Sequence, residues 1–254
     1  MLLAIDVGNT DIVFGLFQDS RLTHQWRVPV KQHTQTQRLT EAYRASQSLD
    51  FSQVRHIILS SVVPGVTPGL VRIIKTIFPI SPLMVGPSLY ASLPFEVLNP
   101  EEIGTDLVAN CVAAYDRFQG PCIIVDFGTA LTFTVISDKK RIEGVAIAPG
   151  LRTSMKALFQ NTAQLPEVPL EMPESALGKG TVHALQAGIL IGYVGLVKHL
   201  LASIQAELHT KAKVIATGGL SHILTPLSAE FDMIDRLLTL DGLRLLAEAA
   251  FPDK

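Results

Sequence analysis

The sequence lacks several features that would point to particular classes of protein. Its two cysteines, Cys111 and Cys122, have neither metal-site nor redox spacing, and we interpret both as small buried residues in a reducing cytoplasm. No block of basic residues occurs, and 21 Lys and Arg against 23 Asp and Glu leave a net charge of −2. This balance excludes the electrostatic footprint of a nucleic-acid-binding protein. The N-terminus has no basic segment ahead of an apolar run, so we expect no signal peptide.

Charge is also missing from residues 181–197 (TVHALQAGILIGYVGLV). This run falls short of the roughly 20 apolar residues that span a bilayer comfortably, and we interpret it as a buried helix, with no membrane partner. Gly188, Gly192 and Gly195 leave one face of that helix bare, which permits close packing. The face packs either within its own subunit or against a second subunit, and the spacing leaves both alternatives open.

The composition and the order of patterns predict an α/β protein. The 254 residues, 48% of them hydrophobic, suffice for one large domain or two ordinary ones and exclude a disordered chain. The first third is predicted to have the order β-β-β-α-β-α-β and to end near Gly86. The expected strands are 2–6, 12–18, 22–28, 56–63 and 83–86, and the expected helices are 36–49 and 68–78.

The second half of the sequence repeats the opening theme. After a proline-punctuated loop at 87–102 and a helix from Thr105, we expect strands at 122–136, 141–149 and 213–217 and helices at 152–160, 176–207 and from Asp241. Two segments each contain an Asp, a Gly and a Thr between two predicted strands: IDVGNTDIVFG near the start and VDFGTALTFTV in the middle. Such a repeat predicts two similar domains, 1–103 and 104–254, that face each other across a cleft.

The two turns suit phosphoryl transfer, which depends on positioning and electrostatics. Glycine lets the backbone approach a phosphate, successive N–H groups bind anions, and Mg²⁺ takes few carboxylates. Each turn alone is a weak signal that also fits an ordinary connection, and the pair is stronger. We expect Asp6 at the metal, with the phosphates held by Gly8, Asn9 and Thr10 from one side and by Asp126, Gly128 and Thr129 from the other.

Three further motifs have competing interpretations. Asp106, where a loop becomes a helix, is either the general base for the acceptor hydroxyl or a helix-capping residue beside Thr105. In ATGGL, Gly218 and Gly219 either admit an adenine or ribose or form an ordinary strand-to-helix turn. LGKGT at 177–181 is not a Walker phosphate loop, because Gly180 follows Lys179 and Pro173 occupies the position of the first glycine.

The ordered set of motifs resembles type III pantothenate kinase. The set comprises DVGNT, SSVVP, GTD before a helix, DFGTA, APGL, GKGT before a long helix, ATGGL and LTLDGL, and it covers nearly the whole chain. The resemblance implies two RNase-H-like domains of the actin, Hsp70 and sugar kinase type. It also implies ATP-dependent phosphorylation of the primary hydroxyl of pantothenate, the first step of coenzyme A synthesis, by a cytoplasmic homodimer that needs Mg²⁺ and K⁺ or NH₄⁺.

Roles for individual residues follow from the same resemblance. It implies that Asp6 serves Mg²⁺ and the phosphates, that Asp106 is the base and that Asp126 binds the monovalent cation. It implies that the acceptor is contacted at the positions of Gly104, Thr105, Leu107 and Thr181, with Thr181 reaching pantothenate from the neighbouring subunit. This last role favours an interface on the glycine-bearing helix.

Two positions depart from the family pattern. Leu107 stands where the family has an arginine for the carboxylate of pantothenate, and Val97 stands where it has a tyrosine. Losing a charge-assisted contact costs on the order of 1.5–3 kcal/mol unless another group, such as Arg152, compensates. Three hypotheses therefore remain: a pantothenate kinase with a rebuilt acceptor pocket, a kinase for a less anionic hydroxyl compound, and a nucleotide-binding regulatory or accessory protein without turnover.

Overall fold

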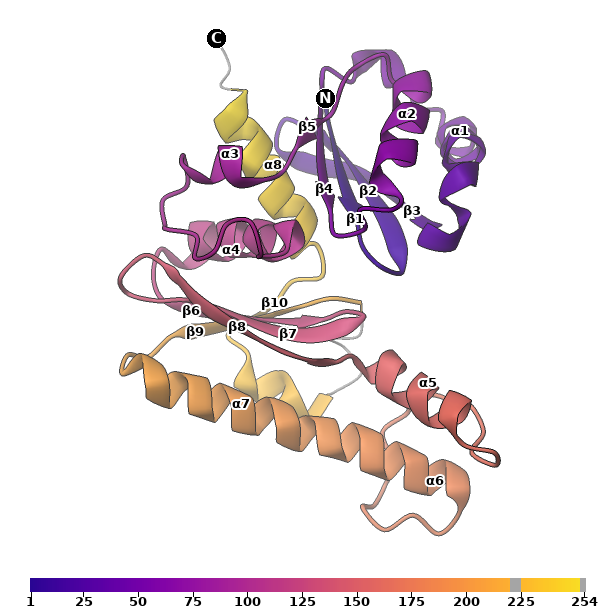
Figure 1. The fold of residues 1–254 in the computed structure, drawn as a ribbon, viewed down its shortest axis with the longest axis vertical. Helices are drawn as coiled ribbons and strands as arrows, with labels where there is room; N and C mark the ends of the chain where they lie inside the picture. Colours follow the sequence, from indigo (N-terminus) through magenta and orange to yellow (C-terminus); the bar gives the residue numbers. More distant parts are fainter. Residues whose placement is uncertain (220–224, 252–254) are drawn as a thin grey trace. The chain divides into compact units, whose positions relative to one another are not determined.

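An antiparallel meander of three strands opens the chain. The computed structural model describes residues 1–219 and 225–251 (Figure 1). Strands β1 (Leu2–Val7), β2 (Asp11–Gln18) and β3 (Arg21–Pro29) are joined by tight turns and pair in sequence order. The meander confirms the three strands expected from the alternating apolar pattern.

The first sheet continues through two parallel strands. β4 (His56–Ser61) pairs with β1 and β5 (Leu83–Met84) pairs with β4, which gives the order β3-β2-β1-β4-β5. The central strand is buried on both faces, with Leu3, Ala4 and Ile5 fully inaccessible, as expected for a strand with parallel and antiparallel neighbours. The connections contain α1 (Thr36–Gln47), α2 (Thr67–Ile77) and the 3₁₀ segments Val30–Gln35 and Phe51–Gln53.

Aromatic stacking organises the core of this sheet. The Trp26 ring centroid lies 4.9 Å from that of Phe14 and 4.9 Å from that of Tyr43, with Phe51 at 6.2 Å. Trp26 is 6% exposed, and its indole Nε1 donates a hydrogen bond of 3.3 Å to Thr40 Oγ1. The stack joins β2, β3 and α1, so these elements share one hydrophobic core.

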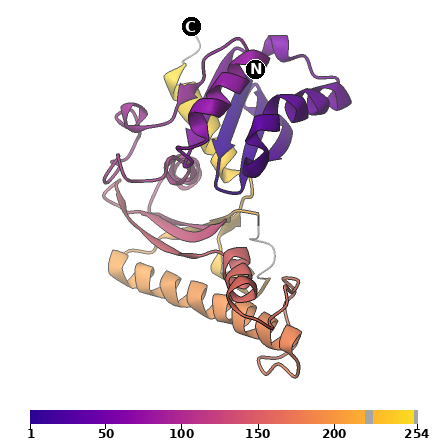
Figure 2. The same cartoon turned by 45° about the vertical axis from the view of Figure 1, so that its right-hand side comes forward.

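The second sheet has the same topology as the first. Strands β6 (Cys122–Phe127), β7 (Ala130–Ile136) and β8 (Ile142–Pro149) form the meander, and β9 (Lys213–Thr217) and β10 (Met233–Ile234) add in parallel to give β10-β9-β6-β7-β8. α7 (Gly192–Leu208) runs along one face of this sheet (Figures 1 and 2). The repeated strand order confirms the internal repeat.

The chain forms two compact units, 1–113 with 238–254 and 114–237, and the division falls within α4 (Thr105–Phe118). The expected boundary at 103 and 104 assigns the closing helix to the second domain. In the structure this helix, α8 (Leu238–Ala250), packs on β1 and β4 and belongs with the first unit. A methyl group on Gly242 would lie 1.8 Å from Ala109 O, so α8 approaches the α4 backbone as closely as glycine allows.

Several boundaries differ from the predictions. The loop at 87–102 contains a one-turn helix, α3 (Pro87–Tyr90), and α5 (Leu151–Asn161) agrees with its prediction. The long helix begins at Thr181 rather than 176, because Gly178 packs against Ala184 and leads into an extended Gly180. It continues through α6 (Thr181–Gln186), a π-helical turn (Ala187–Ile191) and α7. α8 begins at Leu238 rather than Asp241, and the short β10 was not predicted.

Candidate active site

The first predicted turn lies between the two central strands of the first unit. Asp6 precedes the end of β1 and is half-buried, whereas Asn9 and Thr10 are exposed. The Gly8 N–H donates to Asp11 O at 3.0 Å, and the Val30 N–H donates to Thr10 O at 2.8 Å. These bonds fix the turn while leaving its polar tip in solvent, where a ligand has access to it.

Asp6 is connected to the start of α4 through β4. Ser60 is the β4 neighbour of Asp6 in the parallel register, so their side chains share a face of the sheet. Ser60 Oγ lies 2.8 Å from Thr105 Oγ1, and the Ser61 N–H donates to Thr105 Oγ1 at 3.1 Å. The residue after Thr105 is Asp106. The structure therefore brings together the predicted metal carboxylate and the predicted base within one unit, by way of Ser60.

The environment of Asp106 is compatible with its predicted role as a base. Burial raises the pKa of its carboxyl above the ordinary value of 3.8, and hydrogen bonds from the backbone N–H groups of Leu107 and Asp106 oppose that rise. The Leu107 N–H donates to Asp106 Oδ1 at 2.9 Å. The capping interpretation is therefore correct in part, since this carboxylate accepts N–H groups of the first helical turn. A raised pKa also improves a carboxylate as a proton acceptor.

Gly104 leaves the room that this carboxylate occupies. A methyl group on Gly104 would lie 2.5 Å from Asp106 Oδ1, well inside van der Waals contact, and 3.6 Å from Leu107 Cγ and Val62 Cγ1. An alanine would displace the carboxylate and not the backbone. The glycine at this position therefore has a steric reason that concerns the base itself.

Tyr90 is a residue of this region that the sequence did not single out. It is 7% exposed, and burial raises its pKa to about 12, with further contributions from the charges of Asp106 and Glu101. The phenol is therefore protonated at neutral pH and keeps its donor hydrogen. Leu107 and Val97 are both half-buried. A tyrosine inside a predicted loop gives no periodic signal, so only the three-dimensional structure places it near the base.

The second predicted turn belongs to the second unit and joins β6 to β7. Asp126 precedes the end of β6, and the Gly128 N–H donates to Ala130 O at 3.1 Å. Asp126 and Gly128 are half-buried, whereas Thr129 is exposed. The geometry parallels that of the first turn, in which Gly8 donates to Asp11.

Two glycines from distant motifs enclose this turn. A methyl group on Gly150 would lie 2.3 Å from Gly128 O and 2.5 Å from Thr129 O, and the Gly150 N–H donates to Thr129 O at 3.0 Å. A methyl group on Gly218, which has φ +90°, would lie 2.6 Å from Asp126 Oδ1. APGL and ATGGL are thus parts of one cradle around the second turn.

The remaining glycine of ATGGL is sterically open. A methyl group on Gly219 would meet nothing within 4 Å among the described residues, and Leu220 lies outside them. The backbone conformation and contacts of Gly218 require glycine, which fits both an ordinary turn and a turn that holds a nucleotide. Contact of either glycine with adenine or ribose stays a prediction.

Thr181 lies at the exposed start of α6. It is exposed and belongs to the second unit. Methyl groups on Gly188, Gly192 and Gly195 would meet nothing within 4 Å in the described part of the chain. These three glycines therefore make no close contact with the described part of their own chain.

The long helix is also less buried than we expected. Thr181–Leu208 is the one helix of the described residues that is long and apolar enough to cross a membrane by length and composition, and 28% of its most apolar window is buried. Core helices of soluble proteins meet the same criterion. The expectation of a buried helix is thus wrong for this chain by itself, because much of its apolar surface faces outward.

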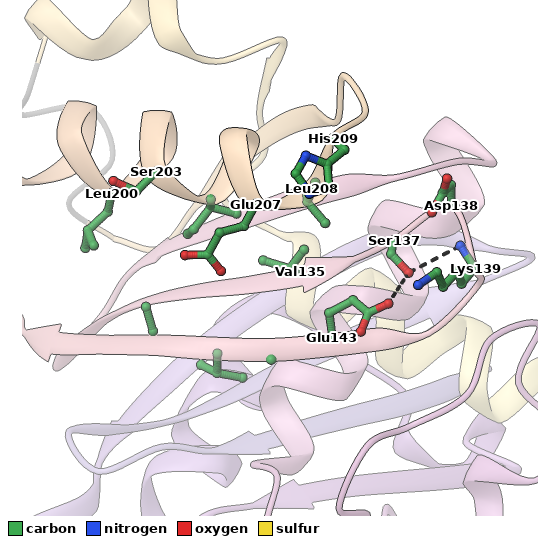
Figure 3. Close-up of a pocket in the computed structure, with 14 residues that line it drawn as sticks. Val135, Ser137, Asp138, Lys139, Glu143, Leu200, Ser203, Glu207, Leu208 and His209 are labelled. Carbon is green, nitrogen blue, oxygen red and sulfur yellow. Dashed lines mark hydrogen bonds between the residues drawn. The ribbon is translucent and has the colours of Figure 1, made fainter.

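A cavity of about 560 Å³ lies elsewhere in the second unit, between the β7–β8 hairpin and the C-terminal half of α7 (Figure 3). Val135, Leu200 and Leu208 contribute apolar side chains to its lining, and Glu207 and His209 contribute polar ones. None of the predicted site residues lines it. The described residues also contain no group of three or more His, Cys, Asp and Glu that could hold a metal ion.

Two sheets of the same order, each with an Asp–Gly turn after its central strand, define the fold of actin, Hsp70 and the sugar kinases. Solved structures agree with it. The (R)-2-hydroxyglutaryl-CoA dehydratase component A of Acidaminococcus fermentans has a TM-score of 0.55 at 12% identity, over 98% of both chains. The inorganic polyphosphate/ATP-glucomannokinase of Arthrobacter sp. strain KM has a TM-score of 0.51 at 14% identity, over 99% of both.

The chain belongs to the type III pantothenate kinase family, whose model matches residues 2–203. It is 42% identical over 252 residues to the type III pantothenate kinase of Geobacter sulfurreducens, covering 98% of each chain. It is 42% identical over 255 residues to that of Moorella thermoacetica, covering 98% of this chain and 99% of the relative. The family resemblance inferred from the motifs is confirmed.

Proposed function

We propose that this chain phosphorylates the primary hydroxyl of pantothenate with ATP, the first step of coenzyme A synthesis. Membership of the family over nearly the whole length defines the reaction. The observation that carries the proposal within the molecule is the link from Asp6 through Ser60 and Thr105 to Asp106. This link joins a phosphate-binding turn to a carboxylate of raised pKa.

Asp106 is the group that accepts the proton of the acceptor hydroxyl. Its raised pKa increases its basicity, and the Leu107 N–H holds one carboxylate oxygen in place. The phenol of Tyr90 stays protonated because burial and the Asp106 charge raise its pKa to about 12. It therefore supplies a hydrogen-bond donor within range of the Asp106 charge.

The two turns bind the phosphates of ATP. Asn9 and Thr10 are exposed in the first turn near Asp6, and Thr129 is exposed in the second turn near Asp126. Gly8 and Gly128 let the backbone of each turn approach a phosphate. Gly218 and Gly219 extend the second cradle toward the nucleoside. When bound, Mg²⁺ neutralises charge on the transferring phosphate. A half-buried carboxylate at a strand end, as in Asp6, fits an ion that takes few protein carboxylates and keeps its waters.

Asp126 is the residue that binds the monovalent cation, K⁺ or NH₄⁺. The carboxylate oxygen Oδ1 and the carbonyl oxygen of Phe127 each lie 2.6 Å from the position of a methyl group on Gly218, so two oxygens gather at one corner. Oxygen donors of this kind replace the hydration shell of a large, weakly hydrated cation.

In this proposal the long helix, Thr181–Leu208, forms the interface of a homodimer. Its three glycines present a face that meets nothing within 4 Å in the described chain, and close helix packing covers such a face. Thr181 then contacts the acceptor of the neighbouring subunit. Light scattering should give a solution mass of two chains, and a concentration-independent mass of one chain would contradict the dimer.

We also propose that the protein is located in the cytoplasm. Cys111 and Cys122 are both buried free thiols, as expected in a reducing compartment.

The decisive experiment is product detection by mass spectrometry. Purified protein receives ATP, Mg²⁺, K⁺ or NH₄⁺ and pantothenate up to high concentration, beside an Asp106→Asn variant. We expect phosphopantothenate from the natural chain and a rate reduced about 10²- to 10⁴-fold in the variant, the usual contribution of a general base. Nucleotide binding should persist in the variant. Equal rates would contradict the role of Asp106.

A second candidate is a kinase for a less anionic hydroxyl compound, and Leu107 is the observation that favours it. This half-buried side chain, in the first turn of α4, cannot pair with a carboxylate. A Leu107→Arg variant tests the point. For a pantothenate kinase, the variant should lower KM for pantothenate by roughly tenfold. If neither protein makes phosphopantothenate although both bind ATP, the acceptor is different or the chain is a regulatory protein.

A further inference from the structure

A row of oxygen-bearing side chains crosses the second sheet at Asp126. Asp126 of β6 is opposite Thr132 of β7 and in register with Thr217 of β9. Side chains at opposite positions of neighbouring strands project from the same face of a sheet. Thr132 is 8% exposed and Thr217 is 1% exposed, so the row lies within the protein and beside a carboxylate.

The hydroxyl of Thr132 has no hydrogen-bond partner, although it is buried. Its Oγ1 is inaccessible and makes no hydrogen bond within the described chain. A buried hydroxyl without a partner is unfavourable, and most such groups in proteins are paired. This oxygen therefore has a lone pair to offer to a ligand beside Asp126.

The space beside Asp126 is bordered by oxygen atoms and by two glycines, which have no side chains. Asp126 Oδ1 lies near the backbones of Gly128 and Gly218, and a methyl group at those positions would stand 3.5 Å and 2.6 Å from it. Phe127 O lies on the same side, 2.6 Å from the Gly218 methyl position. One carboxylate, one carbonyl and one neutral hydroxyl form a donor set suited to a singly charged cation, which binds through neutral oxygens.

We propose that the Thr132 hydroxyl is a ligand of the monovalent cation that Asp126 holds, and thereby sets the affinity for that cation. The inference rests on the proposed function, which places the cation at Asp126. Thr132 acts on the ion and not on the acceptor, so it changes cation dependence and leaves the affinity for pantothenate unchanged at saturating cation.

The same strand supplies a matched control. Thr134 lies two residues further along β7 on the same face, is 1% exposed and also has an unpartnered Oγ1. Its neighbours in register are Ile124 and Val145, which carry no oxygen. Thr134→Val thus removes an equivalent buried hydroxyl from an apolar position, whereas Thr132→Val removes one beside the carboxylate.

The test measures cation binding by two readouts at constant ionic strength, with choline replacing K⁺. The first is the rise of Tm with K⁺ concentration, since a ligand of the folded state stabilises it by mass action. The second is the K⁺ concentration that gives half-maximal kinase rate. We expect Thr132→Val to shift both dependences to about tenfold higher K⁺, Thr134→Val to leave both unchanged, and Thr132→Ser to restore them.

The remaining outcomes distinguish a failure of the Thr132 proposal from a failure of the proposed kinase function. If the natural chain forms phosphopantothenate but responds to K⁺ and NH₄⁺ no more than to choline, the cation proposal fails and Thr132 has no ion to bind. If the natural chain responds and Thr132→Val responds equally, the cation site stands and the role of Thr132 is overturned. A shift of equal size in Thr134→Val would also overturn it, because the effect would then come from general repacking.

Discussion

The two units share one sheet order but use their Asp–Gly turns differently. The glycines inside the two turns are equivalent, since a methyl group on Gly8 or on Gly128 would make only an ordinary contact of 3.4 Å with the nearest backbone oxygen. In the second unit Gly150 and Gly218 press on the turn so closely that methyl groups there would lie 2.3 Å and 2.6 Å from their nearest oxygens. The first turn is connected to the proposed base, and the second turn is enclosed by two glycines of other motifs.

Under the proposed function, the two units take different parts in one reaction. The first unit ties Asp6 to the start of α4, where a carboxylate of raised pKa is available to the acceptor. The second unit converges three glycine motifs on Asp126 and Thr129. Strand order alone does not distinguish them, because the loops that follow the strands carry the difference.

The largest expected effect on stability comes from adding a side chain next to the second turn, which joins β6 to β7. Gly150→Ala should destabilise the protein by about 1–3 kcal/mol, because its methyl group meets the backbone carbonyls of Gly128 and Thr129, which cannot rotate away. Gly8→Ala, within the first turn, should change stability by no more than about 0.5 kcal/mol. Urea unfolding of both variants checks the comparison, and equal losses would show that the two turns are equally enclosed.

A smaller effect, on rate and not on stability, is expected beside the base. Gly104→Ala places a methyl group 2.5 Å from Asp106 Oδ1, and the carboxylate must move since it is the free end of a side chain. We expect kcat to fall roughly 10- to 100-fold from misplacement of the base. The KM for ATP and the urea midpoint should stay close to those of the natural chain. A large loss of stability would mean that the backbone moves instead.

The smallest effect concerns the pH dependence of stability in the first unit. The folded-state pKa of Asp106 is raised above its ordinary value of 3.8, so folding takes up a proton there in the acidic range. Its favourable contribution is fully present below the unfolded-state pKa and is lost as the pH rises through the folded-state pKa. Asp106→Asn should therefore be more stable than the natural chain at neutral pH and less dependent on pH. Parallel pH profiles of Tm would contradict this.

Much of the fold was predictable because strand patterns and glycine turns are local signals. The order of strands and helices up to Gly86 and the start of α4 at Thr105 are confirmed. The helix predicted from residue 176 starts later because Gly178 packs on Ala184, a contact that periodicity does not reveal. Strand β10 is two residues long and lies at a sheet edge, which is too short for an alternating pattern.

The site was predictable as a set of residues but not as an assembly. Asp6, Asp106 and Asp126 stand at motif positions that the sequence displays. Their neighbours do not: Ser60 joins Asp6 to Thr105 through strand register, and Tyr90 lies close to Asp106 from a predicted loop. These relations depend on pairing between segments far apart in the sequence, and no local pattern encodes them.

The aromatic stack in the first unit has a practical consequence. Trp26 is the only tryptophan of the chain and lies between Phe14 and Tyr43, with 6% of its surface exposed. Its fluorescence therefore reports the environment of one unit, whereas far-ultraviolet circular dichroism reports both. Denaturation followed by the two signals should separate into two curves if the units melt independently and coincide if they melt together. The natural chain thus carries a built-in optical reporter for cooperativity between its halves, without any label.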